Sequence, residues 1–472
     1  MRLAQNDLPA LAERFYRTAS GELDDFENSY KEIGMAEVQT AFLLAHYQYT
    51  YLPVGSASHQ YARAVRWAYT CNLHQVEKPR PAPRDESDHT VDDEEKRCLW
   101  WALWAMDTFA SQMSSLPPSI EDGSSSTLLP SCQLSELAIG NFPPSTTRSL
   151  DDNREEKWYN QRPGETQGVK AQLVRLSATA IAREMSSLIR LRQAKPTVIV
   201  QGRLDRLEKQ WYCMISGLSP EFLCPQYCSV DLSVEGHRLR LEALHLVHVT
   251  GLLSGIPPLR PLMMERGRWP NRNEASYNYE TRWGNSISHA LQIVALYRHG
   301  NWPSQAFLEG DAITLFPILW TAASFLTLAL MRSGPVDATE KIALLDALDL
   351  VMAQLTQASR HWGIAEIFLS SLKELRGLSY FKLDMNTIFR LVLGIYSPLK
   401  QDTVEREEPK GSLDLIVAED DIFRDDEHSE TTSSQIPSDW TGEDVSSFID
   451  WSGGNPSIQG NEWCGPEIIH KS

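Results

Sequence analysis

The chain has 472 residues, 42% of them hydrophobic, and a formal net charge of −18. A chain of this length can bury a sizeable core, either as one large helical domain or as roughly two to three ordinary ones. The charge is uneven: the segment from Gln401 onward holds 18 acidic and 4 basic residues, which leaves 44 acids and 40 bases for residues 1–400. This balance excludes a strongly basic surface of the kind that binds nucleic acid.

The cysteines and the N-terminus indicate the cellular compartment. The seven cysteines are scattered at irregular spacing, and their number is odd. Such usage in a long chain is typical of reduced thiols in an intracellular protein. The first residues, MRLAQNDLPALAERFYRTA, lack the continuous apolar stretch of a signal peptide and predict an amphipathic helix instead.

Three helices are expected in the first part of the chain. Apolar residues recur at helical spacing over three segments, 8–20, 35–52 and 57–73. The polar residues 21–34 are expected to separate the first two helices. Residues 76–91 are rich in proline and charge, which predicts a loop.

The segment from Asp92 to Pro117 predicts the central helix of the molecule. Asp92, followed three residues later by Glu95, matches an N-cap with its capping-box partner, and acids favour the positive end of a helix. The residues from Leu99 to Met106 are apolar without a break, and no glycine or proline interrupts the pattern before Pro117. A helix that is apolar on every side is a buried one.

Asp107 is the polar exception in this helix. It shares a face with Trp100 and Leu103 at helical spacing, and a buried carboxylate needs a partner, usually an arginine. Two interpretations follow, a ligand or catalytic acid and a structural ion pair. Because buried acids are mostly paired, the ion pair is favoured, and Arg66 is the expected partner.

The rest of residues 1–400 also predicts helices, after a polar loop at about 145–170. Helical patterns occupy a series of segments, 170–194, 197–217, 233–255, 284–299, 305–332, 339–361, 363–377 and 384–396. No run alternates long enough to predict a convincing strand. We therefore expect an all-α body, a large multi-helix bundle or array that spans residues 1–400.

Residues 312–331 form a long uncharged run, AITLFPILWTAASFLTLALM. A run of this length is enough to span a bilayer. However, Pro317 and four hydroxyl-bearing residues interrupt it, and its flanks show no strong basic bias. A buried core helix explains the run as well and is the interpretation we prefer, so no membrane partner is expected.

Three patterns could carry chemistry, and each has a plainer explanation. Cys224 and Cys228 have loose metal-ligand spacing, but no second pair or histidine lies nearby. His245 and His248 lie three residues apart without an acidic or cysteine neighbour, which favours a structural or surface role. Residues 151–155, DDNRE, match a magnesium-binding pattern of terpene synthases, but the second metal motif of that class is missing. We therefore expect no enzymatic activity, no metal site and no cofactor in this chain.

From residue 401 the composition changes to acids, serine, threonine, glycine and proline with isolated large apolar residues. Such a segment cannot bury enough surface to offset its ordering entropy, so residues 401–472 are expected to be disordered. Alternation of acids and large apolar residues is typical of transcriptional activation segments, although a solubilising tail has the same composition. The expected contact stretch is 439–451, DWTGEDVSSFIDW, through Trp440, Phe448, Ile449 and Trp451.

An ordered set of residues within 36–130 resembles the fungal-specific transcription factor domain, the all-helical middle homology region of fungal zinc-cluster regulators. Its first part resembles the family's arginine-bearing helix and the end of that helix: Ala64, Arg66, Ala68, Leu73 and His74. Its second part resembles the family's central signature: Lys96, Arg97, Trp100, Trp101, Asp107, Pro117, Ile120, Leu129 and Pro130. Asn72 stands where the family has the glycine of the helix end, and asparagine is the next best residue for a left-handed C-cap. Further departures from the family pattern occur at Ala62, Cys98 and Thr108.

The resemblance implies a regulator of RNA polymerase II transcription in the nucleus of a fungus. In such proteins the helical body is thought to sense a small molecule or a partner and to mask or expose an activation segment. The implied partners are coactivators or other transcription machinery at the acidic tail, a small-molecule effector and a second copy of the chain. Arg66, Trp100, Trp101 and Asp107 are expected to hold the central helices together.

The zinc cluster that binds DNA in this family, six cysteines beginning C-x2-C-x6-C, is not found in the chain. Zinc is expected only if such a cluster lies upstream, and DNA binding would then be indirect or through that N-terminal module. Two classes of function stay open. One is the regulatory and activation part of a DNA-binding regulator whose gene model has lost its upstream exons. The other is a DNA-independent sensor or co-regulator that acts through a partner protein.

Overall fold

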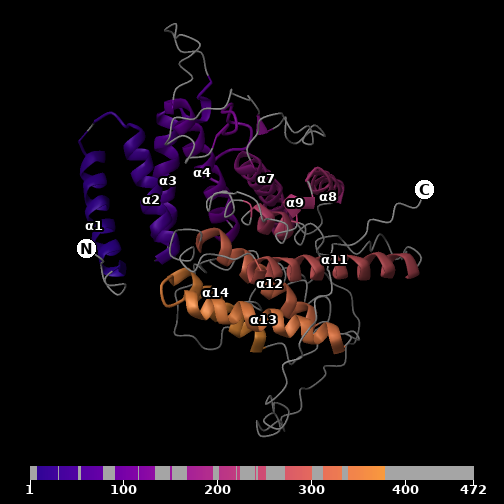
Figure 1. Cartoon of the computed structure of the whole chain (residues 1–472). Helices are drawn as coiled ribbons and strands as arrows, with labels where there is room; N and C mark the ends of the chain where they lie inside the picture. The colour runs from indigo at the N-terminus through magenta and orange to yellow at the C-terminus, as the bar shows by residue number, and fades with distance from the viewer. Residues whose placement is uncertain are drawn as a thin grey trace, which may run out of the picture. The chain divides into compact units, whose positions relative to one another are not determined.

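The computed structural model is helical, with no strand among the residues that it describes (Figure 1). These residues are 8–29, 31–51, 55–77, 91–114, 116–132, 149–150, 167–194, 201–218, 220–223, 240, 243–250, 272–299, 312–331 and 338–377. The chain divides into two units, Met1–Ile416 and Val417–Ser472, and every described residue lies in the first. The expected all-α class is confirmed for this part of the chain.

The helices follow most of the predicted segments. They are α1 (Leu8–Glu27), α2 (Met35–Tyr51), α3 (Gly55–Thr70), the short 3₁₀ helix η2 (Leu73–Gln75), α4 (Val91–Ser114), α7 (Gln167–Ala194), α8 (Gln201–Ser216), α9 (Pro220–Leu223), α11 (Arg272–His299), α12 (Ala312–Met331), α13 (Ala338–Ala358) and α14 (Gly363–Gly377). Residues 243–250 are also helical. The predicted helix 384–396, the tail 401–472 and most of the polar loop 145–170 lie outside the described residues.

Helix α1 extends beyond its predicted end at residue 20. The acids of residues 21–27 make this segment polar, but Leu23 is buried, and the ring of Phe26 packs edge to face on Trp67 of α3 with centroids 6.1 Å apart. Asp24 also pairs with Arg63 of α3, with 2.6 Å between carboxylate oxygen and guanidinium nitrogen. The expectation of a polar connection over 21–34 is therefore wrong for its first part, because two apolar residues three positions apart are enough to hold the last turns of the helix on α3.

Two helix caps were predicted between α3 and α4, and the structure confirms the one at Asn72 but not the one at Asp92. Asn72 has φ 57°, the left-handed conformation expected at the end of the arginine-bearing helix. By contrast, α4 already begins at Val91, so Asp92 lies inside its first turn and pairs with Lys96 at 2.7 Å. Glu95 accepts a hydrogen bond from the side chain of Gln39 in α2 at 2.6 Å. The predicted capping box is therefore wrong, and these acids bind side chains instead.

Helix α7 belongs to two hydrophobic cores, because it carries apolar stripes on two sides. One stripe faces the N-terminal core, which α1–α4 form with it: Val169, Leu173, Leu176 and Ala180. The other faces the C-terminal core, which consists mainly of α7, α8, residues 243–249 and α11–α14: Ala171, Val174, Ala178, Ile181, Met185 and Leu188. Both stripes repeat at intervals of mostly three or four residues, the period of an α-helix. Arg183 lies beside the first stripe, on the side of α7 that meets α4.

Helix α12 is the uncharged run 312–331, and it lies inside the C-terminal core. Every side chain from residue 315 to residue 329 is buried, and the helix packs against α11, α13 and α14 (Figure 1). Phe325 stacks on Trp283 of α11 with ring centroids 5.0 Å apart. The preferred interpretation of this run as a core helix is confirmed. Over the described residues, no helix has the length and apolar character needed to cross a membrane.

Burial predicts which leucines support the fold. Leu103 of α4 is fully buried, whereas Leu43 of α2 is 64% exposed. We expect Leu103→Ala to lower the free energy of unfolding by about 2–5 kcal/mol, because it removes buried methyl groups and leaves a cavity. The control Leu43→Ala should change it by less than about 0.5 kcal/mol. Urea unfolding followed by circular dichroism measures both, and equal losses would contradict the core described above.

Candidate functional site

The signature residues surround one feature, the segment 116–132 that follows α4 and folds back along it. The carboxylate of Asp107 fixes the start of this segment. One oxygen accepts a hydrogen bond from the backbone N–H of Ser119 at 2.8 Å, and the other accepts one from that of Ile120 at 3.0 Å. Because the segment turns back after Pro117 and Pro118, these donors reach a residue that lies about two turns before the end of α4.

Arg183 of α7 neutralises Asp107. Its Nη1 lies 2.9 Å from Oδ2 of Asp107, and both side chains are 2% exposed. The guanidinium also donates to Asp122 at 2.7 Å and to the backbone carbonyl of Ile120, and it lies over the ring of Trp104 with Cζ 5.4 Å from the centroid. A buried ion pair is stable only when its remaining polar atoms are also hydrogen-bonded. Here the turn after α4 supplies these bonds.

The structure corrects the expected partner of Asp107. Arg66 is exposed on α3, whereas the ion pair is made by Arg183, which lies 76 residues after Asp107 in the chain. A sequence signal for Arg183 exists, since it lies between Ile181 and Met185, two core residues of α7. An arginine inside such a pattern indicates a buried cation.

A second ion network holds the end of the same segment. Arg97 donates to Glu77 and to Glu94, each at 2.7 Å. Burial alone would lower the pKa of Arg97, but these two hydrogen bonds raise it. The two glutamates in turn accept from backbone N–H groups of residues 128–132, with 3.1 Å to Leu128 and 3.1 Å to Cys132. The signature residue Arg97 therefore ties α4 to both flanking segments.

The remaining signature residues complete this framework. Trp101 donates its indole N–H to the carbonyl of Leu128 at 2.7 Å, and Trp100 is fully buried against the rings of Tyr69 and His74. The carbonyl of His74 accepts from the backbone N–H of residue 126 at 2.9 Å. Pro117 is exposed at the turn, and Pro130 is buried. The bonds of Leu128 and residue 126 join the segment 116–132 to α4 and to η2, and the ring contacts of Trp100 join α4 to α3 and η2.

The buried carboxylates around α4 have a structural role. Both oxygens of the Asp107 carboxylate accept hydrogen bonds, and both oxygens of Glu94 and of Glu77 do so as well. A general acid or base must be able to reach a substrate proton, and these carboxylates are instead committed to backbone N–H groups and arginines. Of the two interpretations of Asp107, the geometry supports the structural ion pair.

A histidine pair lies in the C-terminal core. Nδ1 of His248 lies 3.2 Å from Nδ1 of His289 in α11, and Trp211 of α8 packs edge to face on His289 with centroids 4.9 Å apart. Burial lowers the pKa of His248 well below 6.5, helped by the charges of His289 and His245, and burial lowers that of His289 to about 4. The pair is therefore neutral near pH 7, with one imidazole donating to the other. The favoured structural role of His248 agrees with this contact.

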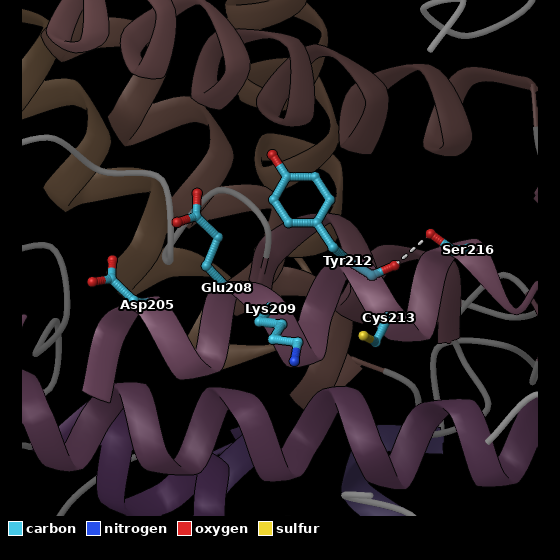
Figure 2. Close-up of a pocket in the computed structure, with 6 residues that line it drawn as sticks. All are labelled: Asp205, Glu208, Lys209, Tyr212, Cys213 and Ser216. Atoms are coloured by element: carbon cyan, nitrogen blue, oxygen red, sulfur yellow. Dashed lines mark hydrogen bonds between the residues drawn. The ribbon is translucent and has the colours of Figure 1, made fainter. Parts of the chain in front are cut away.

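A groove of about 500 Å³ runs along α8 and is open to solvent. Figure 2 shows Glu208 and Tyr212 pointing to one side of the helix, with Lys209 and Cys213 pointing away from them. Ser216 donates to the backbone carbonyl of Tyr212 at 2.8 Å, so its hydroxyl is bonded within the helix. All of the lining residues come from α8 itself, so the groove brings together no groups from different elements.

The patterns that were weighed as possible metal ligands are only partly described. Over the described residues, no group of three or more His, Cys, Asp or Glu side chains could hold a metal ion. Cys224, Cys228 and residues 151–155 lie outside that part of the chain. The tail residues Trp440, Phe448, Ile449 and Trp451 lie outside it as well.

Comparisons with known proteins found no similar protein. A scan against protein-family models found no match, and the searches of curated proteins and of solved structures found none either. The family resemblance therefore rests on the residues quoted from the sequence.

A double-mutant cycle tests the ion pair between α4 and α7. Asp107→Asn and Arg183→Met should each lower the free energy of unfolding by about 3–5 kcal/mol, because each leaves the partner's charge buried without a counter-ion. The double variant should lose about 1–3 kcal/mol less than the sum of the single losses, as measured by urea unfolding. In the control cycle, Arg66→Met should be additive with Asp107→Asn. Additivity in the Arg183 cycle would rule out a direct contact.

The histidine pair predicts a loss of stability in mild acid. Both imidazoles titrate near about 6.5 in an unfolded chain, so between about pH 6.5 and pH 4 the unfolded chain binds more protons than the folded one. Stability that is complete above about pH 6.5 is therefore lost as the pH falls toward about 4, by up to about 1.4 kcal/mol per pH unit for each histidine.

Urea unfolding between about pH 7 and about pH 5 measures this slope. His289→Gln should make it shallower, because one titrating group is removed, whereas the control His361→Gln, at an exposed residue, should leave it unchanged. An equal slope in wild type and His289→Gln would show that the pair is not the titrating group.

Proposed function

We propose that this protein is a fungal regulator of RNA polymerase II transcription, with the helical body as its regulatory part and residues 401–472 as its activation part. The observation that carries the proposal is the ordered set of residues within 36–130. Its order and spacing resemble those of the fungal-specific transcription factor domain. Two of its charged members, Arg97 and Asp107, take part in the two ion networks around α4, as expected of residues that define a common framework.

The acidic tail supports the second half of the proposal. In its sequence, acids are interspersed with large apolar residues, a composition typical of segments that bind shallow grooves of coactivators. The helical body would then shift the equilibrium between a state in which the tail is masked and a state in which it is available. Such a shift needs no chemical step. The nucleus is the compartment in which this activity takes place.

The second candidate is a DNA-independent sensor or co-regulator that acts through a partner protein. The observation that favours it is the irregular spacing of the seven cysteines, which form no six-cysteine cluster. In this case the contact with DNA would belong to the partner. The body and the tail would keep the roles given above.

A reporter assay tests the activation part. The full chain is fused to an unrelated DNA-binding domain, and transcription from a promoter with the matching site is measured. Combined replacement of Trp440, Phe448 and Trp451 by alanine should reduce transcription to the level of the DNA-binding domain alone, because aromatic anchors carry most of the binding energy of such contacts. Replacement of Ser446 and Ser447 by alanine is the control and should leave activity intact. Full activity in the aromatic variant would contradict the assignment of the tail as the activation part.

The 5′ end of the native transcript separates the two candidates. An upstream, in-frame segment with six cysteines and a basic linker would make this chain the regulatory and activation portion of a DNA-binding factor. Translation that starts at Met1 would instead favour the co-regulator.

A further inference from the structure

Helix α12 contains two buried polar groups without a hydrogen-bond partner. Nε1 of Trp320 and Oγ of Ser324 are both buried, at residues that are 3% and 0% exposed, and neither has a partner among the described residues. The two residues are four positions apart, so they lie on the same face of the helix. On this face Trp320 stacks on Phe368 of α14 with ring centroids 5.5 Å apart.

Several comparable groups among the described residues are hydrogen-bonded. In the same helix, Thr321 and Thr327 donate to the carbonyls of Pro317 and Ala323, each at 2.8 Å. Serine could bond in the same way, but the hydroxyl of Ser324 does not. Two other buried tryptophans donate their indole N–H groups to backbone carbonyls, Trp101 to Leu128 and Trp211 to Val247. The indole N–H of Trp100 also lacks a hydrogen bond, but it lies among the rings of Tyr69 and His74.

A pair of unsatisfied polar groups in the most apolar helix is costly to the free protein. Each buried donor or acceptor that loses its water without gaining a partner destabilises the fold, and replacement by an apolar group removes this cost. Such local conflicts are expected at functional sites, where the partner is a ligand. We propose that Trp320 and Ser324 form a binding site for a small uncharged molecule, mainly apolar and carrying an oxygen acceptor such as a carbonyl.

The side chains define this class of ligand. The indole N–H of Trp320 can only donate, whereas the hydroxyl of Ser324 can donate and accept. An oxygen acceptor can bond either donor, and the ring of Phe368 and the neighbouring apolar residues of α12 favour an apolar skeleton. An uncharged ligand is favoured, because residues 315–329 of α12 are buried and carry no charged side chain.

The site deepens the proposed function, since such a molecule would be the effector that a regulatory body senses. Binding is measured on the purified full chain without any transcription. A failure of the binding experiment therefore leaves the reporter result untouched, and a failure of the reporter leaves the site intact.

Two probes that differ in one group test the site. Acetophenone carries the carbonyl, and ethylbenzene has the same skeleton with a methylene in its place. Titration calorimetry on the full chain should give saturable binding of acetophenone, about three- to tenfold tighter than that of ethylbenzene, the factor expected of one net hydrogen bond. Saturable binding of neither probe, or equal affinity for both, would overturn the proposal.

Matched variants assign the preference to these two groups. Ser324→Ala and Trp320→Phe should each reduce the preference for acetophenone over ethylbenzene. The controls Thr327→Val and Trp211→Phe remove the same functional groups where these are already bonded, and they should keep the wild-type ratio. Thermal unfolding checks that each variant is folded, and Ser324→Ala is the decisive one, because it removes a single unsatisfied atom. A wild-type ratio in folded Ser324→Ala would contradict the site.

Discussion

The buried pair of Asp107 and Arg183 is the constraint on which the rest of the helical body depends. Two charges in an apolar interior are stable only if all of their hydrogen-bonding capacity is used, and no single helix can supply that many partners. The turn at residues 117–122 supplies two backbone N–H groups, one carbonyl and one carboxylate. The need to satisfy this pair therefore explains why the chain reverses after α4 and returns along it.

The same pair fixes how two hydrophobic cores are joined. Helix α4 contributes most of its apolar residues to the N-terminal core, but Phe109 and Met113 belong to the C-terminal core. Helix α7 is divided in the same way, with one stripe in each core. The ion pair therefore joins the two helices that each contribute to both cores. At the other end of the returning segment, the network around Arg97 is a second buried ion cluster that binds backbone N–H groups of this segment.

Apolar periodicity was enough to predict the helices, because most of them bury one or two faces in a core. It failed where polarity in the sequence hid a local contact, as at Leu23 and Phe26 in α1. The site was harder to predict than the fold. That Asp107 is buried and paired follows from its helix, but the identity of the partner depends on tertiary packing, and Arg183 lies in a helix of a different part of the sequence. The predicted capping box was wrong for a related reason, since Asp92 pairs with Lys96 one turn later and Glu95 accepts from Gln39 of α2.

Two buried polar groups of α12 lack hydrogen-bond partners, unlike the buried carboxylates of α4, and this difference bears on the proposed regulation. Around α4 the buried carboxylates are fully bonded, so any rearrangement would leave a charge without its partner and is strongly opposed. In α12 the buried groups of Trp320 and Ser324 are unsatisfied, so a ligand that bonds them gains free energy without breaking an existing contact. A response to such a ligand would therefore begin in the C-terminal core. Helix α7 is common to both cores, so it is the element through which the response would reach the framework around α4.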